Sequence, residues 1–121
     1  MRWVGLVRNV MLGRDGLDRA RLLDTVAQVG GSRVRSYLTT GNVTFDAGAK
    51  EVDDLTGRLE VELSRVVSRP AMVAIREYGW LRDLVTNDLF AGFDAEECEF
   101  EVAFLRRAAP PIDPEVTPRD W

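Results

Sequence analysis

The residues from Arg33 to Asp46, which read RVRSYLTTGNVTFD, most constrain what this chain folds into because they predict a β-hairpin. Apolar and polar side chains alternate on both sides of Thr39 to Asn42, as they do in two neighbouring strands. Gly41 supplies the positive φ that tight turns need, and asparagine also tolerates a left-handed conformation. We therefore expect a turn at residues 39–42, with Val34, Ser36 and Leu38 on one face of the first strand.

Length and composition indicate one soluble domain. The chain has 121 residues, 45% of them apolar and 30% charged, which is enough for a hydrophobic core. No apolar run approaches the roughly 18 residues of a membrane span, and the N-terminus lacks a signal-peptide layout. We expect a cytoplasmic protein that makes no membrane contact. The single cysteine, Cys98, excludes an internal disulfide, and we expect it to be a buried and inert thiol.

The absence of histidine excludes several kinds of active site. Ser-His-Asp and Cys-His nucleophilic sites, proton transfer by histidine and metal binding by histidine are all removed. The net charge of −4 provides no basic field for a nucleic acid backbone, so no nucleic acid partner is expected. The adjacent acidic pairs Asp53-Asp54 and Glu96-Glu97 are interpreted as surface charges, and we expect neither a metal nor a cofactor.

The elements around the hairpin follow a familiar order. An apolar run at 3–8 predicts a strand, and Asp18 caps a predicted helix that ends before Gly30-Gly31. A second helix is predicted at 52–67, with leucines at helical spacing, and a fourth strand at 71–75. The order β-α-β-β-α-β predicts an α+β fold with a ferredoxin-like antiparallel sheet. We expect Leu22, Val26, Leu55, Leu59 and Leu63 to pack on one face of this sheet.

The C-terminal third predicts additions to this unit. A helix is expected at 77–85, with Leu81, Leu84 and Val85 at core spacing, followed by a loop that buries Leu89, Phe90 and Phe93. Residues 99–106 alternate as a fifth strand does, and 108–121 holds four of the five prolines, as in an extended arm. The predicted division is one domain at 1–107 and a tail at 108–121. Within that domain, 1–76 is the ferredoxin-like unit and 77–107 is the added helix and strand.

Three features in series resemble the DUF1697 family: Leu6-Val7-Arg8 followed by Gly13, the helix ending at Gly30, and the segment VRSYLTTGNVTF. The hairpin of that family carries a Ser-Gly-Asn-Val-Val-Phe type motif. Gly41, Asn42, Val43 and Phe45 match it, and Thr40 replaces its serine. The resemblance implies a short member that lacks roughly the C-terminal third of a usual one. It implies no settled biochemical role.

The same topology predicts where a site would lie. In a ferredoxin-like sheet, the loop after the first strand, the hairpin tip and the turn into the fourth strand meet at one edge. Arginine forks and glycine-loop amides at that edge suit a phosphate or a carboxylate. The candidate ligand-binding residues are Arg8, Asn9, Gly13, Arg14, Thr40, Gly41, Asn42 and Arg69. No catalytic residue is predicted.

Other interpretations of these residues stay open. Gly41 and Asn42 are most simply explained as a turn that needs an unusual φ, and Arg8 serves equally as one partner of a structural ion pair. We expect a small domain of unknown biochemical role that is not an enzyme. The alternatives are a binding protein or enzyme for a small anionic ligand, and an interaction module that acts through its C-terminal tail.

A homodimer is also expected. The apolar face of the strand at 99–106 has no further unit to bury it, and an unpaired apolar edge favours pairing with another chain. The proline-rich arm ending in Trp121 suits a contact across a neighbouring subunit. In the alternative, the strand joins its own sheet and the protein is a monomer.

Overall fold

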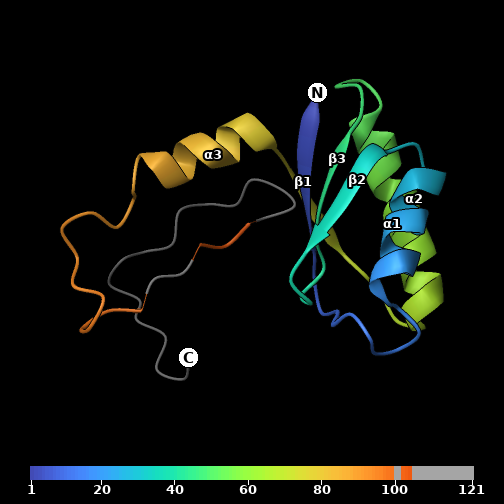
Figure 1. Ribbon diagram of the computed structural model, residues 1–121, viewed down its shortest axis with the longest axis horizontal. Coiled ribbons are helices and arrows are strands. Elements are labelled where there is room, and N and C mark those ends of the chain that lie inside the picture. Colours follow the sequence, from blue (N-terminus) through green and yellow to red (C-terminus); the bar gives the residue numbers. More distant parts are fainter. Residues whose placement is uncertain (100–101, 105–121) are drawn as a thin grey trace.

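The protein is an α+β structure with a four-stranded antiparallel sheet (Figure 1). The computed structural model describes residues 1–99 and 102–104. In this part of the chain the elements follow the order β1 (Arg2–Val7), α1 (Arg19–Gln28), β2 (Ser32–Tyr37), β3 (Asn42–Asp46), α2 (Val52–Val67), β4 (Val73–Glu77) and α3 (Tyr78–Thr86). The predicted α+β class and the predicted four-stranded antiparallel sheet are confirmed.

The strands lie in the order β2-β3-β1-β4, and every neighbouring pair is antiparallel. The two central strands, β1 and β3, are paired from Arg2 with Asp46 to Leu6 with Asn42. Because side chains alternate along a strand, Val43 and Phe45 share one face of β3 and Thr44 lies on the other. All three are buried, as expected for a central strand.

One face of the sheet is covered by α1 and α2, while α3 lies on the other side (Figure 1). The core forms between the two helices and the sheet, and Phe45 is its largest fully buried side chain. The five residues predicted to pack there are all buried: Leu22, Val26, Leu55, Leu59 and Leu63. Helical spacing in the sequence was sufficient to identify them, since one stripe of each helix faces the sheet.

The helix ends follow local chemistry. The side chain of Asp18 accepts a hydrogen bond from the backbone N–H of Arg21 at 2.7 Å and so caps α1. After α1, Gly30 takes a φ of +112°, a conformation that glycine adopts without strain. At the end of α2, Ser68 is left-handed and precedes Pro70. The fourth strand starts two residues later than predicted because the Ala71 N–H bonds to the hydroxyl of Ser64 on α2.

The hairpin turn begins one residue earlier than predicted. Residues 38–41 form the turn, and Leu38 takes a φ of +60° with 69% of its surface exposed. The prediction that Leu38 shares one face of the strand with Val34 and Ser36 is wrong, because β2 ends at Tyr37 and Leu38 is already part of the turn.

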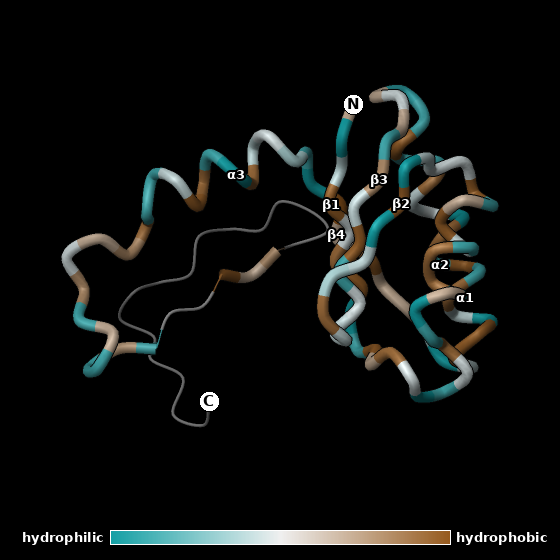
Figure 2. The backbone as a smooth tube through the Cα atoms, in the orientation of Figure 1, coloured by the Kyte–Doolittle hydropathy of each residue, from teal (hydrophilic) through white to brown (hydrophobic). Residues whose placement is uncertain are grey.

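The predicted burial of the C-terminal apolar residues is also wrong for Val85, Leu89 and Phe93, whereas Leu81, Leu84 and Phe90 are half-buried. No residue of α3 is fully buried, and Val85 is 73% exposed. Leu89 and Phe93, which follow the helix, are exposed as well. Figure 2 shows hydrophobic and hydrophilic residues alternating along α3, which runs away from the sheet. Within the described residues its apolar side chains are therefore at most half-buried, although their spacing is that of a core helix.

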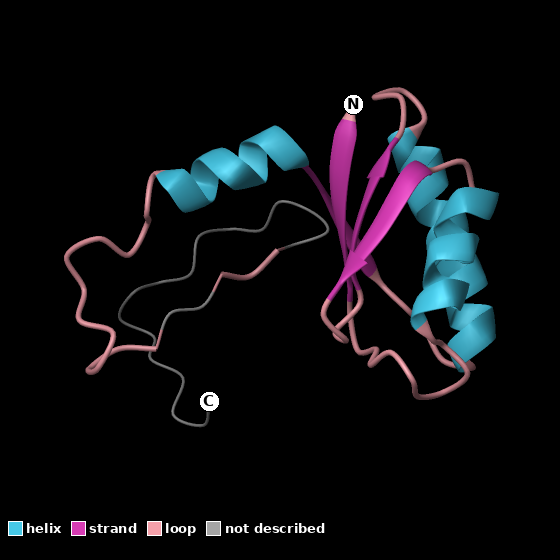
Figure 3. Ribbon diagram, in the orientation of Figure 1, coloured by secondary structure: helices cyan, strands magenta, loops and turns pink. Residues whose placement is uncertain are grey.

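The segment after α3 differs from the predicted strand where it is described. Residues 87–99 are loops and turns (Figure 3). Glu99 and residues 102–104 have no regular secondary structure, and the rest of the predicted strand, with the tail at 108–121 and the boundary before it, lies outside the described residues. Cys98 is exposed, not buried, because it lies in a polar turn beside Glu96 and Glu97, away from the core.

Candidate functional site

Three segments far apart in the sequence meet at one end of the sheet, which we call the loop end: residues 8–17, 38–42 and 68–72. The backbone N–H of Val7 donates to the carbonyl of Gly41 at 3.2 Å, and that of Leu12 donates to Thr39 at 2.8 Å. The N–H of Arg8 donates to the carbonyl of Met72 at 2.8 Å. The structure thus brings together the three segments that carry the predicted site residues.

Arg69 holds the loop end together. Its guanidinium makes an ion pair with Asp15 at 2.8 Å and donates to the carbonyl of Asn9, also at 2.8 Å. Asn9 is left-handed, with a φ of +60°, and this directs the chain from β1 into the loop. Arg69 therefore connects the turn before β4 to both ends of the first loop, and this role leaves less of its guanidinium for a ligand.

Gly41 and Gly13, the two glycines of the predicted site, are needed for different reasons. Gly41 has a φ of +83°, and a Cβ there would lie 2.6 Å from Cγ2 of Val10 and 3.1 Å from Cβ of Val7. Gly13 has a φ of +93° with nothing within 4 Å of the Cβ position. Close packing against Val7 and Val10 disfavours any side chain at Gly41, whereas only the backbone conformation favours glycine at residue 13. Gly41 is in the first place a structural residue.

Two arginines of the predicted site remain available. Arg8 and Arg14 are exposed, and neither has a hydrogen bond or an ion pair from its side chain within the described residues. Thr40 is exposed at the hairpin tip, and Asn42 is half-buried between Leu6 and Tyr37 of the neighbouring strands. Two guanidiniums and a hydroxyl can bind an anion, but this set contains no acid–base pair for catalysis.

The ionised carboxylate of Asp46 lies at the opposite end of the hairpin. It accepts hydrogen bonds from Arg33 and from Arg2, the latter at 3.0 Å. Both bonds lower the pKa of Asp46 below its ordinary value because they stabilise the charged form, and the bond from Arg33 has the larger effect. The pairs connect the start of β2 and the start of β1 to the end of β3.

The depressed pKa of Asp46 predicts a specific acid sensitivity. A carboxyl group with a lowered pKa in the folded state stabilises the protein above its unfolded pKa of about 3.9, and loses that contribution as the pH falls through the folded value. We expect Asp46→Asn to lower the free energy of unfolding near neutral pH and to lessen its decline below about pH 4. Urea unfolding across this pH range measures both effects. The exposed Asp24→Asn is the control, and an acid profile for Asp46→Asn that parallels the wild type would contradict the assignment.

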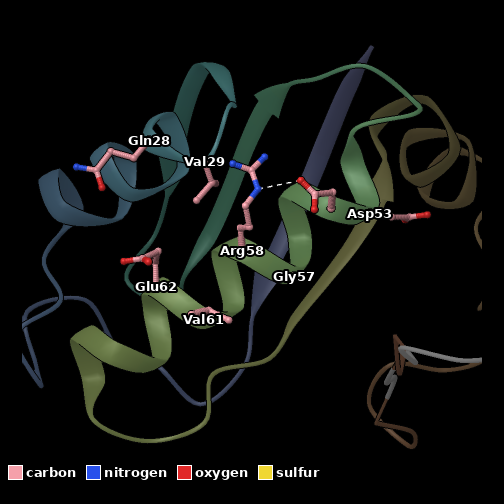
Figure 4. A pocket seen from close by; sticks show the side chains of 8 residues that line it. Gln28, Val29, Asp53, Gly57, Arg58, Val61 and Glu62 are labelled. Atoms are coloured by element: carbon pink, nitrogen blue, oxygen red, sulfur yellow. Dashed lines mark hydrogen bonds and ion pairs between the residues drawn. The ribbon is translucent and has the colours of Figure 1, made fainter.

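A groove between the C-terminus of α1 and the outer face of α2 was not predicted (Figure 4). It has a volume of about 670 Å³ and is lined by Gln28, Val29, Asp53, Asp54, Gly57, Arg58, Val61 and Glu62. Arg58 pairs with Asp54 at 2.9 Å. Gly57 leaves the middle of α2 without a side chain. A glycine within a helix was the one feature of the sequence that indicated an opening at this position. Within the described residues, no three acidic or cysteine side chains gather as metal ligands do.

A second groove, here called the α3 groove, is mostly apolar. It has a volume of about 360 Å³ and lies between α3, the residues that follow it and residues 102–104. Its lining is Leu81, Leu84, Val85, Asp88, Leu89, Phe90, Val102 and Phe104. The sequence marked most of these residues as apolar, but helical spacing alone does not distinguish a groove from a core.

The fold defines the class of the molecule, a small α+β protein with a four-stranded antiparallel sheet, two helices on one face and a third on the other. The described residues contain no helix that is both long and apolar enough to cross a membrane. The chain belongs to the DUF1697 family of proteins of unknown function, whose pattern matches residues 1–117. The predicted family is therefore confirmed.

A solved structure shares this fold. The conserved bacterial protein SP0830 from Streptococcus pneumoniae superposes with a TM-score of 0.55 and 22% sequence identity, over 77% of this chain and 52% of that one. This chain thus spans about half the length of that relative. At this identity the likeness concerns the fold alone. Among curated proteins, none matches this chain.

Proposed function

We propose that this protein is a non-catalytic binding domain that holds a small anionic group at the loop end. The observation that carries the proposal is the pair of exposed guanidiniums, Arg8 and Arg14, which have no carboxylate partner within the described residues. They project from a loop whose backbone is held by Arg69 and by hydrogen bonds to the hairpin. Guanidinium groups bind phosphate or carboxylate with two parallel hydrogen bonds, so a phosphate-bearing or carboxylate-bearing ligand fits.

Several broader features belong to the same proposal. Residues 1–76 are a ferredoxin-like unit, which is supported by the strand order β2-β3-β1-β4 and by two helices on one face.

The cytoplasmic location follows from the sequence argument, and a free cysteine suits a reducing compartment. An interaction through the tail at 108–121 remains the alternative function.

The anion-binding proposal predicts stabilisation by phosphate. A ligand at roughly ten times its Kd adds about 1.4 kcal/mol to the free energy of unfolding, which raises the melting temperature by several degrees. The measurement is thermal unfolding in phosphate against chloride at equal ionic strength. We expect the double variant Arg8→Ala, Arg14→Ala to lose the phosphate response and Arg21→Ala, an exposed arginine on α1, to keep it. A wild-type protein that does not respond to phosphate, or a response that survives the double variant, would contradict the proposal.

A further inference from the structure

The α3 groove is formed largely by a strongly acidic segment of the chain, and Asp88 of that segment lies in its lining. Residues 77–99 contain seven acidic residues and a single arginine, so this segment is far more negative than the chain as a whole, whose net charge is −4. Val85, in the lining of the groove, is exposed, and so is Trp80 on the same helix. A short amphipathic helix gains most of its stability from packing its apolar face, and an exposed apolar area of this kind marks an interaction site.

The hairpin tip forms a second surface of opposite charge. We define the hairpin surface as Met11, Arg19, Arg35, Tyr37 and Leu38. Its three apolar members are all substantially exposed, and the hydrogen bond from Leu12 to Thr39 keeps the first loop against the tip. The Arg19 guanidinium donates to the carbonyl of Leu38 at 3.1 Å. Within the described residues neither arginine has a carboxylate partner.

Leu38 is the most unusual residue of this surface. It is an apolar side chain at the tip of a turn, in a left-handed conformation that leucine rarely adopts. Both its exposure and its backbone conformation are unfavourable in an isolated chain. Strained residues of this kind persist at binding sites, where a contact uses the side chain that they present.

We propose that the protein is a homodimer in which each copy inserts Leu38 into the α3 groove of the other copy. In this arrangement Arg35 of one copy faces Asp88 of the second copy, the acidic residue in the lining of the groove. The groove is large enough for a leucine side chain, and the two surfaces are opposite in charge. Because each copy carries both surfaces, two identical contacts form about a twofold axis and close the assembly.

Charge decides between this contact and its simplest rival. A dimer that packs α3 against α3 would bring two strongly acidic segments together, and like charges at an interface oppose association. The hairpin surface has the complementary charge and an apolar anchor. The sequence predicted a homodimer from the apolar face of a strand at 99–106. The contact proposed here includes Val102 and Phe104 of that segment as part of the groove lining, and adds α3 and the hairpin tip.

Light scattering of the full chain at micromolar concentrations and low salt tests the proposal. We expect a mass of twice that of the single chain, which is 13.6 kDa, and we expect the measured mass to fall toward the mass of the single chain as salt is added. Leu38→Asn should give a monomer. The substitution should not destabilise the fold of the single chain, since asparagine tolerates the left-handed conformation. The matched control is Val61→Asn, an exposed aliphatic residue on α2, which should remain a dimer.

A charge exchange tests the reciprocal pairing itself. Arg35→Glu and Asp88→Arg should each be monomeric alone, because each places like charges in both contacts. An equimolar mixture of the two variants should form a dimer, since every contact then pairs opposite charges. A wild-type mass of 13.6 kDa at every concentration, a mass above that of a dimer, a Leu38→Asn dimer or a mixture that stays monomeric would each overturn the proposal.

Discussion

Replacing Phe45 by alanine is expected to lower the free energy of unfolding by about 3 to 5 kcal/mol, which is a large part of the stability of a typical domain. Phe45 lies on a central strand and is fully buried between the sheet and both covering helices. Its aromatic ring is the largest side chain of the core, so its removal leaves a cavity that the strands on either side cannot close. Urea unfolding followed by circular dichroism measures the change.

Phe93→Ala is the matched control for this substitution. It removes the same side chain from a residue that is 64% exposed, so its effect is expected to lie within about 0.5 kcal/mol. The slope of the free energy against urea concentration should be equal in all three proteins, because each unfolds the same surface. A loss below about 1 kcal/mol for Phe45→Ala would show that the core is not centred on this residue.

Gly41→Ala is expected to cost about 3 kcal/mol, for two separate reasons. The left-handed conformation at a φ of +83° disfavours any residue with a Cβ. The new methyl group would also lie 2.6 Å from the Val10 side chain and 3.1 Å from Cβ of Val7. Either the hairpin tip or the end of β1 has to move, and the hydrogen bond from Val7 to Gly41 is then weakened.

Gly13→Ala separates the two causes. Gly13 has a similar φ of +93° but open space around the Cβ position, so its substitution includes only the conformational cost of about 1 to 2 kcal/mol. The difference between the two variants measures the steric contact between the hairpin and β1. Equal losses for Gly41→Ala and Gly13→Ala would mean that this contact relaxes without cost.

The candidate site was predicted in part. Sequence order alone indicated that the loop after β1, the hairpin tip and the turn before β4 meet, and backbone hydrogen bonds join them. The residue types did not show what each arginine does there. Arg69 pairs with Asp15, which is distant in the sequence, whereas Arg8 and Arg14 remain unpaired in the described part of the chain. Ion pairs depend on which loops approach one another, and that is a tertiary property.

The sequence by itself determined the four strands of the sheet, the two helices that cover it and the core between them, though not every strand end. The bounds of α2 at Val52–Val67 and the cap of α1 at Asp18 follow from local chemistry, namely side-chain spacing and a hydrogen bond within one turn. Only the tertiary structure decided whether the apolar residues of α3 are buried or exposed. Val85 has the spacing of a core residue and is exposed, because burial depends on whether another layer of the fold covers the helix, and α3 runs away from the sheet.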